Sequence, residues 1–173
     1  DIDIVSREFT QPPPLGLAYA AAIAEQHGHQ AIIIDANIRP RLTKKQVTDR
    51  ILDFGAQMVG FLLTAYMFHQ TLEWIRFIKQ HTGLPVLVGN MLLDLYPREV
   101  MTYKEIDYGI IGPATKNLPI LLHNLEKGRS LENIEGLAFR QNGNICINFP
   151  SSLEEDFGTL PFPARHLLRN AKY

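Results

Sequence analysis

The sequence lacks several features that mark common classes of protein. It has a single cysteine, Cys146, and one thiol cannot form an internal disulfide, a zinc site or an iron–sulfur cluster. The formal net charge is -1, with acids and bases mixed along the chain, so there is no basic stripe for nucleic acid or an anionic membrane. The longest apolar run, residues 58–68, is too short to span a bilayer. With no secretory signal pattern either, we expect a cytoplasmic protein.

The usual phosphate-binding and metal-binding motifs are absent as well. Neither G-x-G-x-x-G nor G-x-x-x-x-G-K followed by Ser or Thr occurs, so a nucleotide-phosphate cradle is unsupported. Six histidines are present, but no pair shows metal-site spacing with a third ligand. His69 falls nearest the expected site, and an ordinary cap or core histidine is the simpler interpretation. The sequence indicates neither a metal ligand nor a catalytic residue.

What the sequence does contain is an alternation of short apolar runs and longer amphipathic segments, typical of βαβ units. The 173 residues suffice for one domain with a core. Five β/α repeats predict an α/β fold, a flavodoxin-like or Rossmann-like doubly wound parallel sheet of order 2-1-3-4-5. We expect strands at residues 2–5, 31–34, 58–63, 86–88 and 108–111, and helices at residues 15–27, 43–54, 68–80, 95–102 and 117–127.

The pattern changes after the fifth helix. Two short apolar runs, residues 137–140 and 144–149, flank Asn142-Gly143, and Asn-Gly at such a place predicts a β-hairpin because both residues tolerate a positive φ. The sequence thus divides into three parts: a Rossmann-like domain (1–130), a hairpin appendage (131–150) and a linker (151–173).

The fold predicts where a ligand binds without any motif. In open α/β sheets, ligands lie beyond the carboxyl ends of the strands. The loops there are residues 6–14, 64–67, 89–91 and 112–115, which are rich in Gly and Pro and carry Tyr66, Met67 and Met91. Such loops can approach a large, mostly apolar ligand closely, although the same residues also suit plain βα turns.

Five phrases, in order along the chain, resemble the N-terminal cobalamin-binding domain of radical S-adenosylmethionine (radical SAM) enzymes. They are residues 13–21 (PPLGLAYAA), 28–37 (GHQAIIIDAN), 59–61 (VGF), 135–143 (EGLAFRQNG) and 160–165 (LPFPAR). Each phrase alone is weakly specific, but together they cover nearly the whole chain.

The resemblance implies that the chain binds cobalamin in the base-off form, with the nucleotide tail buried beside the sheet. The D-x-H-x-x-G motif that supplies a histidine to cobalt is absent, so no histidine ligand is implied. Two departures from the family pattern are Asn90, in place of a second glycine, and residues 113–116, in place of an acidic phrase. The residues that the resemblance brings to the cofactor are Leu15, Gly16, Leu63, Thr64, Tyr66, Met67, Gly89, Asn90, Met91, Gly112, Pro113 and Ala114.

The resemblance also implies a longer protein. The family's three-cysteine cluster motif does not occur here, so we expect an iron–sulfur cluster and S-adenosylmethionine only in a downstream radical SAM domain of the same chain. This fragment is then not catalytic alone, and the parent is a cobalamin-dependent enzyme such as a methyltransferase. Two alternatives stay open: an interaction or scaffold domain that has lost the cofactor, and a small-molecule sensor that uses the same crevice.

Overall fold

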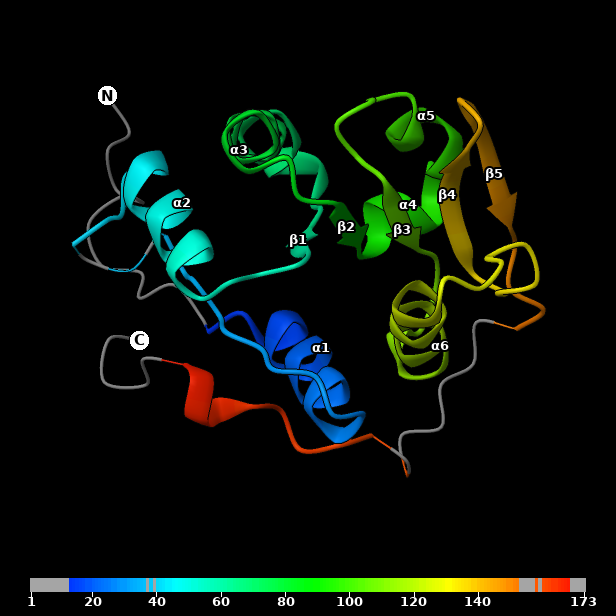
Figure 1. The fold of residues 1–173 in the computed structure, drawn as a ribbon, viewed down its shortest axis with the longest axis horizontal. Helices are drawn as coiled ribbons and strands as arrows, with labels where there is room; N and C mark the ends of the chain where they lie inside the picture. The colour runs from blue at the N-terminus through cyan, green and yellow to red at the C-terminus, as the bar shows by residue number, and fades with distance from the viewer. Residues whose placement is uncertain (1–12, 37, 39, 153–157, 159, 169–173) are drawn as a thin grey trace, which may run out of the picture.

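The computed structural model describes residues 13–36, 38, 40–152, 158 and 160–168. They form one five-stranded sheet with helices on both faces (Figure 1). The helices are α1 (Leu15–Gln26), α2 (Lys44–Asp53), α3 (Phe68–Thr82), α4 (Met91–Leu95), α5 (Pro97–Met101) and α6 (Ala114–Lys127), with 3-10 turns η1 (Ala65–Met67) and η3 (Arg165–Leu167). The strands are β1 (Val59–Leu62), β2 (Val86–Gly89), β3 (Tyr108–Ile110), β4 (Leu137–Gln141) and β5 (Asn144–Asn148).

The sheet has the order β1-β2-β3-β4-β5. The pairs β1–β2 and β2–β3 are parallel, whereas β4 pairs antiparallel with both β3 and β5. The predicted α/β fold is confirmed, and the third, fourth and fifth expected strands are neighbours in the expected order. The predicted hairpin is also present: Asn142 and Gly143 both have positive φ, and β4 extends the same sheet beyond β3.

Residues 31–34, expected as the second strand, are not a strand in the structure. Ala31 and Ile33 instead pack with a cluster on α1, and Ile34 packs with a cluster formed by α2 and α3. An apolar run predicts burial, but a strand also needs a hydrogen-bonded neighbour. The neighbour expected from the sequence is residues 2–5, which lie outside the described residues.

Local signals account for several helix ends. Thr43 and Gln46 form the predicted capping box at the start of α2, and α3 ends at Gly83 in the left-handed conformation that favours glycine. The helix expected at residues 95–102 is different: α4 already begins at Met91, and Pro97 starts the separate helix α5. The break falls there because Pro97 has no N–H to continue the first helix but suits the first turn of the next.

Two helical layers enclose the sheet. Figure 1 shows α3 and α5 on one side and α1 and α6 on the other. In β2, Val86 and Val88 belong to the core on the α3 and α5 side, whereas Leu87 packs toward α6, the alternation that a doubly covered strand requires. None of the described helices is long and apolar enough to cross a membrane.

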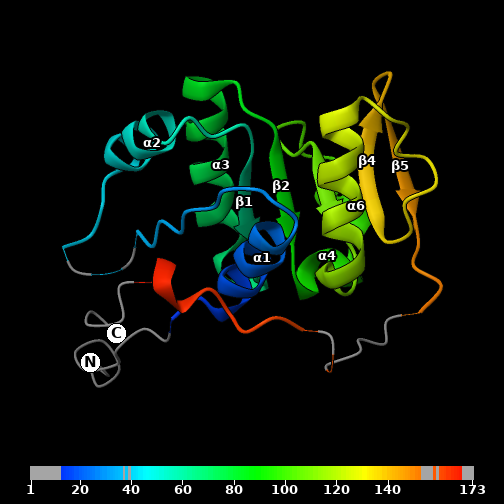
Figure 2. The ribbon, with the colours of Figure 1, turned by 60° about the horizontal axis from the view of Figure 1, so that its bottom comes forward.

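The residues expected to act as a linker include a segment that lies against the domain. Residues 160–168 run along α1 in Figures 1 and 2. The backbone N–H of Ala164 donates to the carbonyl oxygen of Ala18 (2.9 Å), and the Ala164 side chain is buried among the alanines of α1. The Nε2 atom of His166 lies 3.0 Å from the Oε1 atom of Glu25. This segment therefore covers part of the outer face of α1.

Candidate functional site

The carboxyl ends of the three parallel strands meet at one edge of the sheet. Leu62, the last residue of β1, is in register with Gly89, the last residue of β2, and β3 ends beside them at Ile110. Figure 2 shows α4 directly beyond the end of β2. We call the segments that follow the three strands, residues 63–67, 90–96 and 111–114, together with the start of α1, the rim.

Backbone contacts hold the rim segments together. The Leu63 N–H donates to the Gly89 carbonyl oxygen (2.9 Å), and the Ile111 N–H donates to the Gly136 carbonyl oxygen (2.7 Å). A carboxylate makes a third link, since Asp94 Oδ1 on α4 accepts from the Gly112 N–H (2.7 Å). Hydrogen bonds to charged acceptors are the stronger kind. The segments after β2 and β3 are thus joined directly, and the segment after β1 is tied to the end of β2.

The start of α1 lies against the end of β1. A Cβ added to Gly16 would stand 2.7 Å from Leu62 Cδ1, so glycine is what allows the helix to approach the strand this closely. Leu15, one residue earlier, is 43% exposed. The structure therefore brings both predicted α1 residues to the rim.

The exposed side chains of the rim are mainly apolar. Tyr66 is 84% exposed, Met91 67%, Leu95 64% and Tyr96 52%. Met91 and Leu95 are four residues apart on α4 and share one face of that helix. Large apolar side chains exposed along one edge of a sheet are typical of a binding site.

The remaining predicted residues differ in what they expose. Thr64, Met67, Gly112, Pro113 and Ala114 are partly buried in the rim segments. Leu63 lies at the rim by its backbone, but its side chain is fully buried in the core.

Gly89 has open space beside it. An added Cβ there would meet only the carbonyl oxygen of Ile110, at 3.8 Å. Asn90, the next residue, is exposed and has a positive φ of 91°.

No metal centre stands out. In the part of the chain that the structure describes, no group of three His, Cys, Asp or Glu side chains could hold a metal ion. His69 is exposed at the start of α3, with its ring edge-to-face against Phe68 at a centroid distance of 5.7 Å.

Three rim residues could not be found from the sequence: Asp94, Leu95 and Tyr96. The sequence placed the helix too late, which put Leu95 at its start rather than on the exposed face of α4. The contact between Asp94 and Gly112 joins residues 18 apart, and no short motif signals it. The one available clue is the spacing of Met91 and Leu95, which shows only once α4 is placed correctly.

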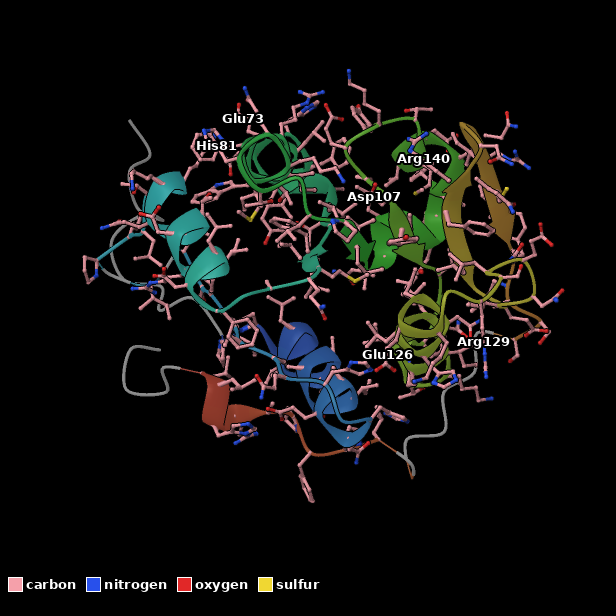
Figure 3. The ribbon with its side chains drawn as sticks, in the orientation of Figure 1. Glu73, His81, Asp107, Glu126, Arg129 and Arg140 are labelled. Atoms are coloured by element: carbon pink, nitrogen blue, oxygen red, sulfur yellow. The ribbon has the colours of Figure 1, made fainter. Side chains whose placement is uncertain are left out.

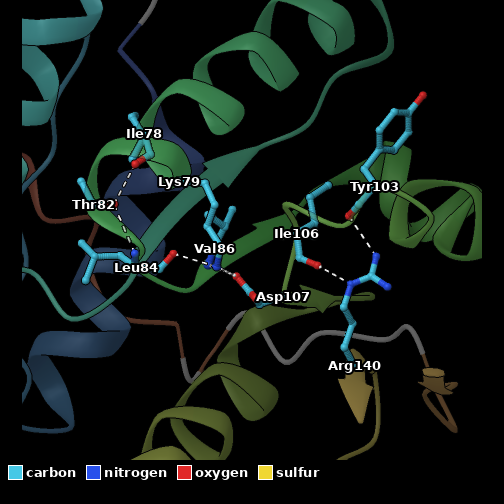
Figure 4. A network of polar contacts seen from close by, with 9 residues as sticks. All are labelled: Ile78, Lys79, Thr82, Leu84, Val86, Tyr103, Ile106, Asp107 and Arg140. Carbon is cyan, nitrogen blue, oxygen red and sulfur yellow. Dashed lines mark hydrogen bonds and ion pairs between the residues drawn. The ribbon is translucent and has the colours of Figure 1, made fainter. Parts of the chain in front are cut away.

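The opposite edge of the sheet, where the parallel strands begin, is polar, and its charged side chains form hydrogen bonds within the chain (Figure 4). Asp107 Oδ2 accepts from the Val86 N–H and from Lys79 Nζ, both at 2.7 Å. Arg140 donates to the carbonyl oxygens of Ile106 (3.1 Å), Tyr103 (3.0 Å) and Met101. Figure 3 shows Asp107 between α3 and Arg140.

One tyrosine at this edge, Tyr108, has a shifted pKa. Burial, with the negative charge of the adjacent Asp107, raises the pKa of Tyr108 above its ordinary value. The hydroxyl of this half-buried tyrosine thus resists ionisation more than a free one.

The model of the B12-binding domain family matches residues 4–122, more than half of the chain. The chain belongs to the B12-binding domain family. The site that the sheet topology selects is thus the carboxyl edge of a B12-binding domain.

Two curated relatives of this B12-binding domain are longer proteins. An uncharacterized methyltransferase of Pyrococcus horikoshii is 29% identical over 168 residues, which cover 95% of this chain and 36% of that protein. The anaerobic magnesium-protoporphyrin IX monomethyl ester cyclase of Synechocystis is 23% identical over 150 residues, covering 84% of this chain and 30% of that protein. The chain spans about a third of the length of the curated relatives it matches.

Solved structures share the fold of this B12-binding domain. The radical S-adenosylmethionine methyltransferase TsrM of Kitasatospora setae, with cobalamin and a 4Fe-4S cluster bound, matches with a TM-score of 0.72 and 21% identity, over 91% of this chain and 30% of that chain. The cobalamin-dependent S-adenosylmethionine radical enzyme OxsB, with aqua-cobalamin bound, matches with a TM-score of 0.74 and 17% identity, over 89% of this chain and 22% of that chain. At these identities the likeness establishes the fold.

Proposed function

We propose that this B12-binding domain holds cobalamin at its rim, base-off, with no side chain of this chain as a ligand to cobalt. The observation that carries the proposal is the set of exposed apolar side chains at the carboxyl edge of the parallel strands: Leu15, Tyr66, Met91, Leu95 and Tyr96. A corrin ring is broad and largely apolar, so covering these side chains removes them from water at a favourable free energy of about 25 cal/mol per Å².

The open space beside Gly89 fits the cofactor as well. A nucleotide tail that runs beside the sheet needs a strand end without a side chain, and Gly89 has no atom near its missing Cβ except the Ile110 carbonyl oxygen. Two of the rim segments are already linked through Asp94 and Gly112. Binding therefore has to order less of the chain and loses less conformational entropy.

The chain's own residues would hold and orient the cofactor. Bound cobalamin supplies the reactive cobalt, and the protein supplies position, water exclusion and electrostatics. Thr64, Tyr66, Met67 and Met91 are our candidates for the face nearest the cobalt, because they lie in the two segments that follow β1 and β2.

We further propose that the domain is the N-terminal part of a radical SAM enzyme, and specifically a methyltransferase. The named methyltransferase among its relatives and the fold shared with TsrM support this. In such a protein the iron–sulfur cluster and S-adenosylmethionine belong to a downstream domain, so this chain carries no catalytic residue of its own. Sequencing the parent gene downstream should reveal a three-cysteine cluster motif.

Retention of hydroxocobalamin by the purified chain tests the central claim. The chain is mixed with hydroxocobalamin and passed through a gel-filtration column, and the absorbance spectrum of the protein peak is recorded. We expect a corrinoid spectrum in that peak. A peak without corrinoid would contradict the proposal and favour the alternative of an interaction domain without cofactor.

A matched pair of exposed apolar residues locates the site. Leu95→Gln, at the rim, should weaken binding about fivefold, because it loses roughly 1 kcal/mol of apolar contact. Ile120→Gln is the control, since Ile120 is 47% exposed on α6 and outside the rim. Equal affinities of the two variants in an absorbance titration would place the corrinoid elsewhere.

A further inference from the structure

Asn90 has a backbone conformation that suits glycine and no other residue. Its φ is 91° and its ψ is 169°, a region that side chains with a Cβ enter only under strain. In the described part of the chain, the other non-glycine residue with positive φ is Asn142, at 51°. That residue lies in the hairpin turn, in the left-handed region that asparagine tolerates.

The part of the fold that the structure describes makes no use of the Asn90 side chain. Asn90 precedes α4 but makes no side-chain capping bond to it, and its side chain has no hydrogen bond to any described residue. Only its backbone contributes, because its carbonyl oxygen accepts from the Leu93 N–H (2.8 Å). Glycine would supply the same carbonyl without the strain.

Strained residues persist mainly where function retains them. The Asn90 side chain is exposed at the rim, between the open strand end at Gly89 and the exposed Met91. It is therefore an amide with no hydrogen-bond partner among the described residues, at the point where the proposed ligand meets the end of β2.

We propose that Asn90 is a specificity-determining residue whose side-chain amide pairs with a carboxamide on the periphery of the corrin ring. This inference rests on the proposed function. An amide offers both a donor and an acceptor, and two amides can form a pair of hydrogen bonds. The carboxamides around a corrin ring offer the matching groups, in a site whose other exposed side chains are mainly apolar.

The test compares three variants of the chain by thermal unfolding without ligand and by absorbance titration with hydroxocobalamin. Asn90→Gly should raise Tm by about 4 °C, because strain is relieved, and weaken binding about tenfold, because the amide pair is lost. Asn90→Ala keeps the strained Cβ, so it should show the same tenfold loss with no rise in Tm. Asn142→Gly, the control, should leave the affinity unchanged.

A second probe separates the ring from the tail. Diaquacobinamide has the ring carboxamides but no nucleotide tail, so Asn90→Gly should weaken its binding by the same factor. A loss confined to hydroxocobalamin would overturn the assignment to a ring carboxamide. Asn90→Gly binding as tightly as wild type would overturn the inference while leaving the proposed function intact. Wild type that retains no corrinoid would overturn the proposed function itself.

Discussion

The two edges of the parallel strands differ in kind. At the amino edge, Asp107 pairs with Lys79 and accepts from the backbone, and Arg140 donates to backbone carbonyl oxygens. Among the described side chains no buried polar atom lacks a partner. At the carboxyl edge, large apolar side chains are exposed and Asn90 has a strained backbone. The polar contacts at the amino edge stabilise the fold, whereas the exposed side chains at the carboxyl edge can contact a ligand.

This difference shows how one sheet separates stability from binding. Groups whose contacts are complete within the chain offer little to a ligand. Exposed apolar area and the Asn90 amide, which has no hydrogen-bond partner among the described residues, contribute favourable free energy only when a ligand covers them. Substitutions at the amino edge should therefore change the free energy of unfolding, and substitutions at the rim should mainly change affinity. Three variants test how sharp this separation is.

Gly136→Ala should have the largest effect, because it disturbs the support of the rim from within the core. Gly136 has a φ of +65°, and an added Cβ would lie 2.6 Å from the Ile111 carbonyl oxygen and collide with Asn117 Nδ2. We expect a loss of about 3 kcal/mol in the free energy of unfolding, from strain and overlap together. Urea unfolding measures it.

The matched control is Gly143→Ala in the hairpin turn. Its φ is +82°, but no atom lies within 4 Å of an added Cβ, so only strain remains, at about 1 kcal/mol. Equal losses for the two variants would mean that crowding at Gly136 has no energetic consequence. Because the Gly136 carbonyl oxygen accepts from the Ile111 N–H, Gly136→Ala should also weaken corrinoid binding, and it is the variant in which the two properties change together.

Asp107→Ala should have the next largest effect, confined to stability. It removes the acceptor of the buried Val86 N–H and the partner of Lys79. A buried donor left without an acceptor lowers the free energy of unfolding by about 2 kcal/mol. The control is Asp49→Ala. The partner of Asp49, Lys45, has a side chain that is 80% exposed, so the free energy of unfolding should fall by no more than about 0.5 kcal/mol. A fall in the corrinoid affinity of Asp107→Ala, measured at a temperature at which the variant is folded, would show that the two edges are coupled.

The sequence predicts helix ends, the hairpin turn and the strand ends better than it predicts the rim surface. Capping at Thr43, glycine stops such as Gly83 and the Asn142-Gly143 turn act within a few residues, so local pattern is enough. The parallel order then follows from the β/α alternation, and it brings Gly16, Thr64, Gly89 and Gly112 to one edge.

What the sequence could not supply depends on distant partners. The apolar run at residues 31–34 signals burial, but only a neighbouring strand could make it part of the sheet. No local pattern predicts the strained φ of Asn90; the one sign of it is the resemblance, in which Asn90 stands in place of a second glycine. The tie between Asp94 and Gly112 crosses two βα units, and the exposed face of α4 depends on where that helix begins.

The smallest expected effect lies at the far end of the carboxyl edge, where β4 begins. Glu135 Oε2 accepts from the Ser151 hydroxyl (2.7 Å) and backbone N–H (3.3 Å). These hydrogen bonds, with the positive charge of Lys116, lower the pKa of Glu135 below its ordinary value of 4.5. A carboxylate with a lowered folded-state pKa stabilises the fold above its unfolded-state pKa and loses that contribution as the pH falls through the folded-state value.

Glu135→Gln should therefore lower the urea midpoint slightly at neutral pH, and the difference from wild type should shrink toward roughly pH 3. Ser151→Ala removes the hydroxyl donor, so it should reproduce part of the neutral-pH loss and show the same decline. A difference that stays constant between the two pH values would mean that the contact acts through shape rather than charge. Since both residues are exposed and solvent screens the contact, a large effect here would contradict the division of the sheet into a stabilising amino edge and a binding carboxyl edge.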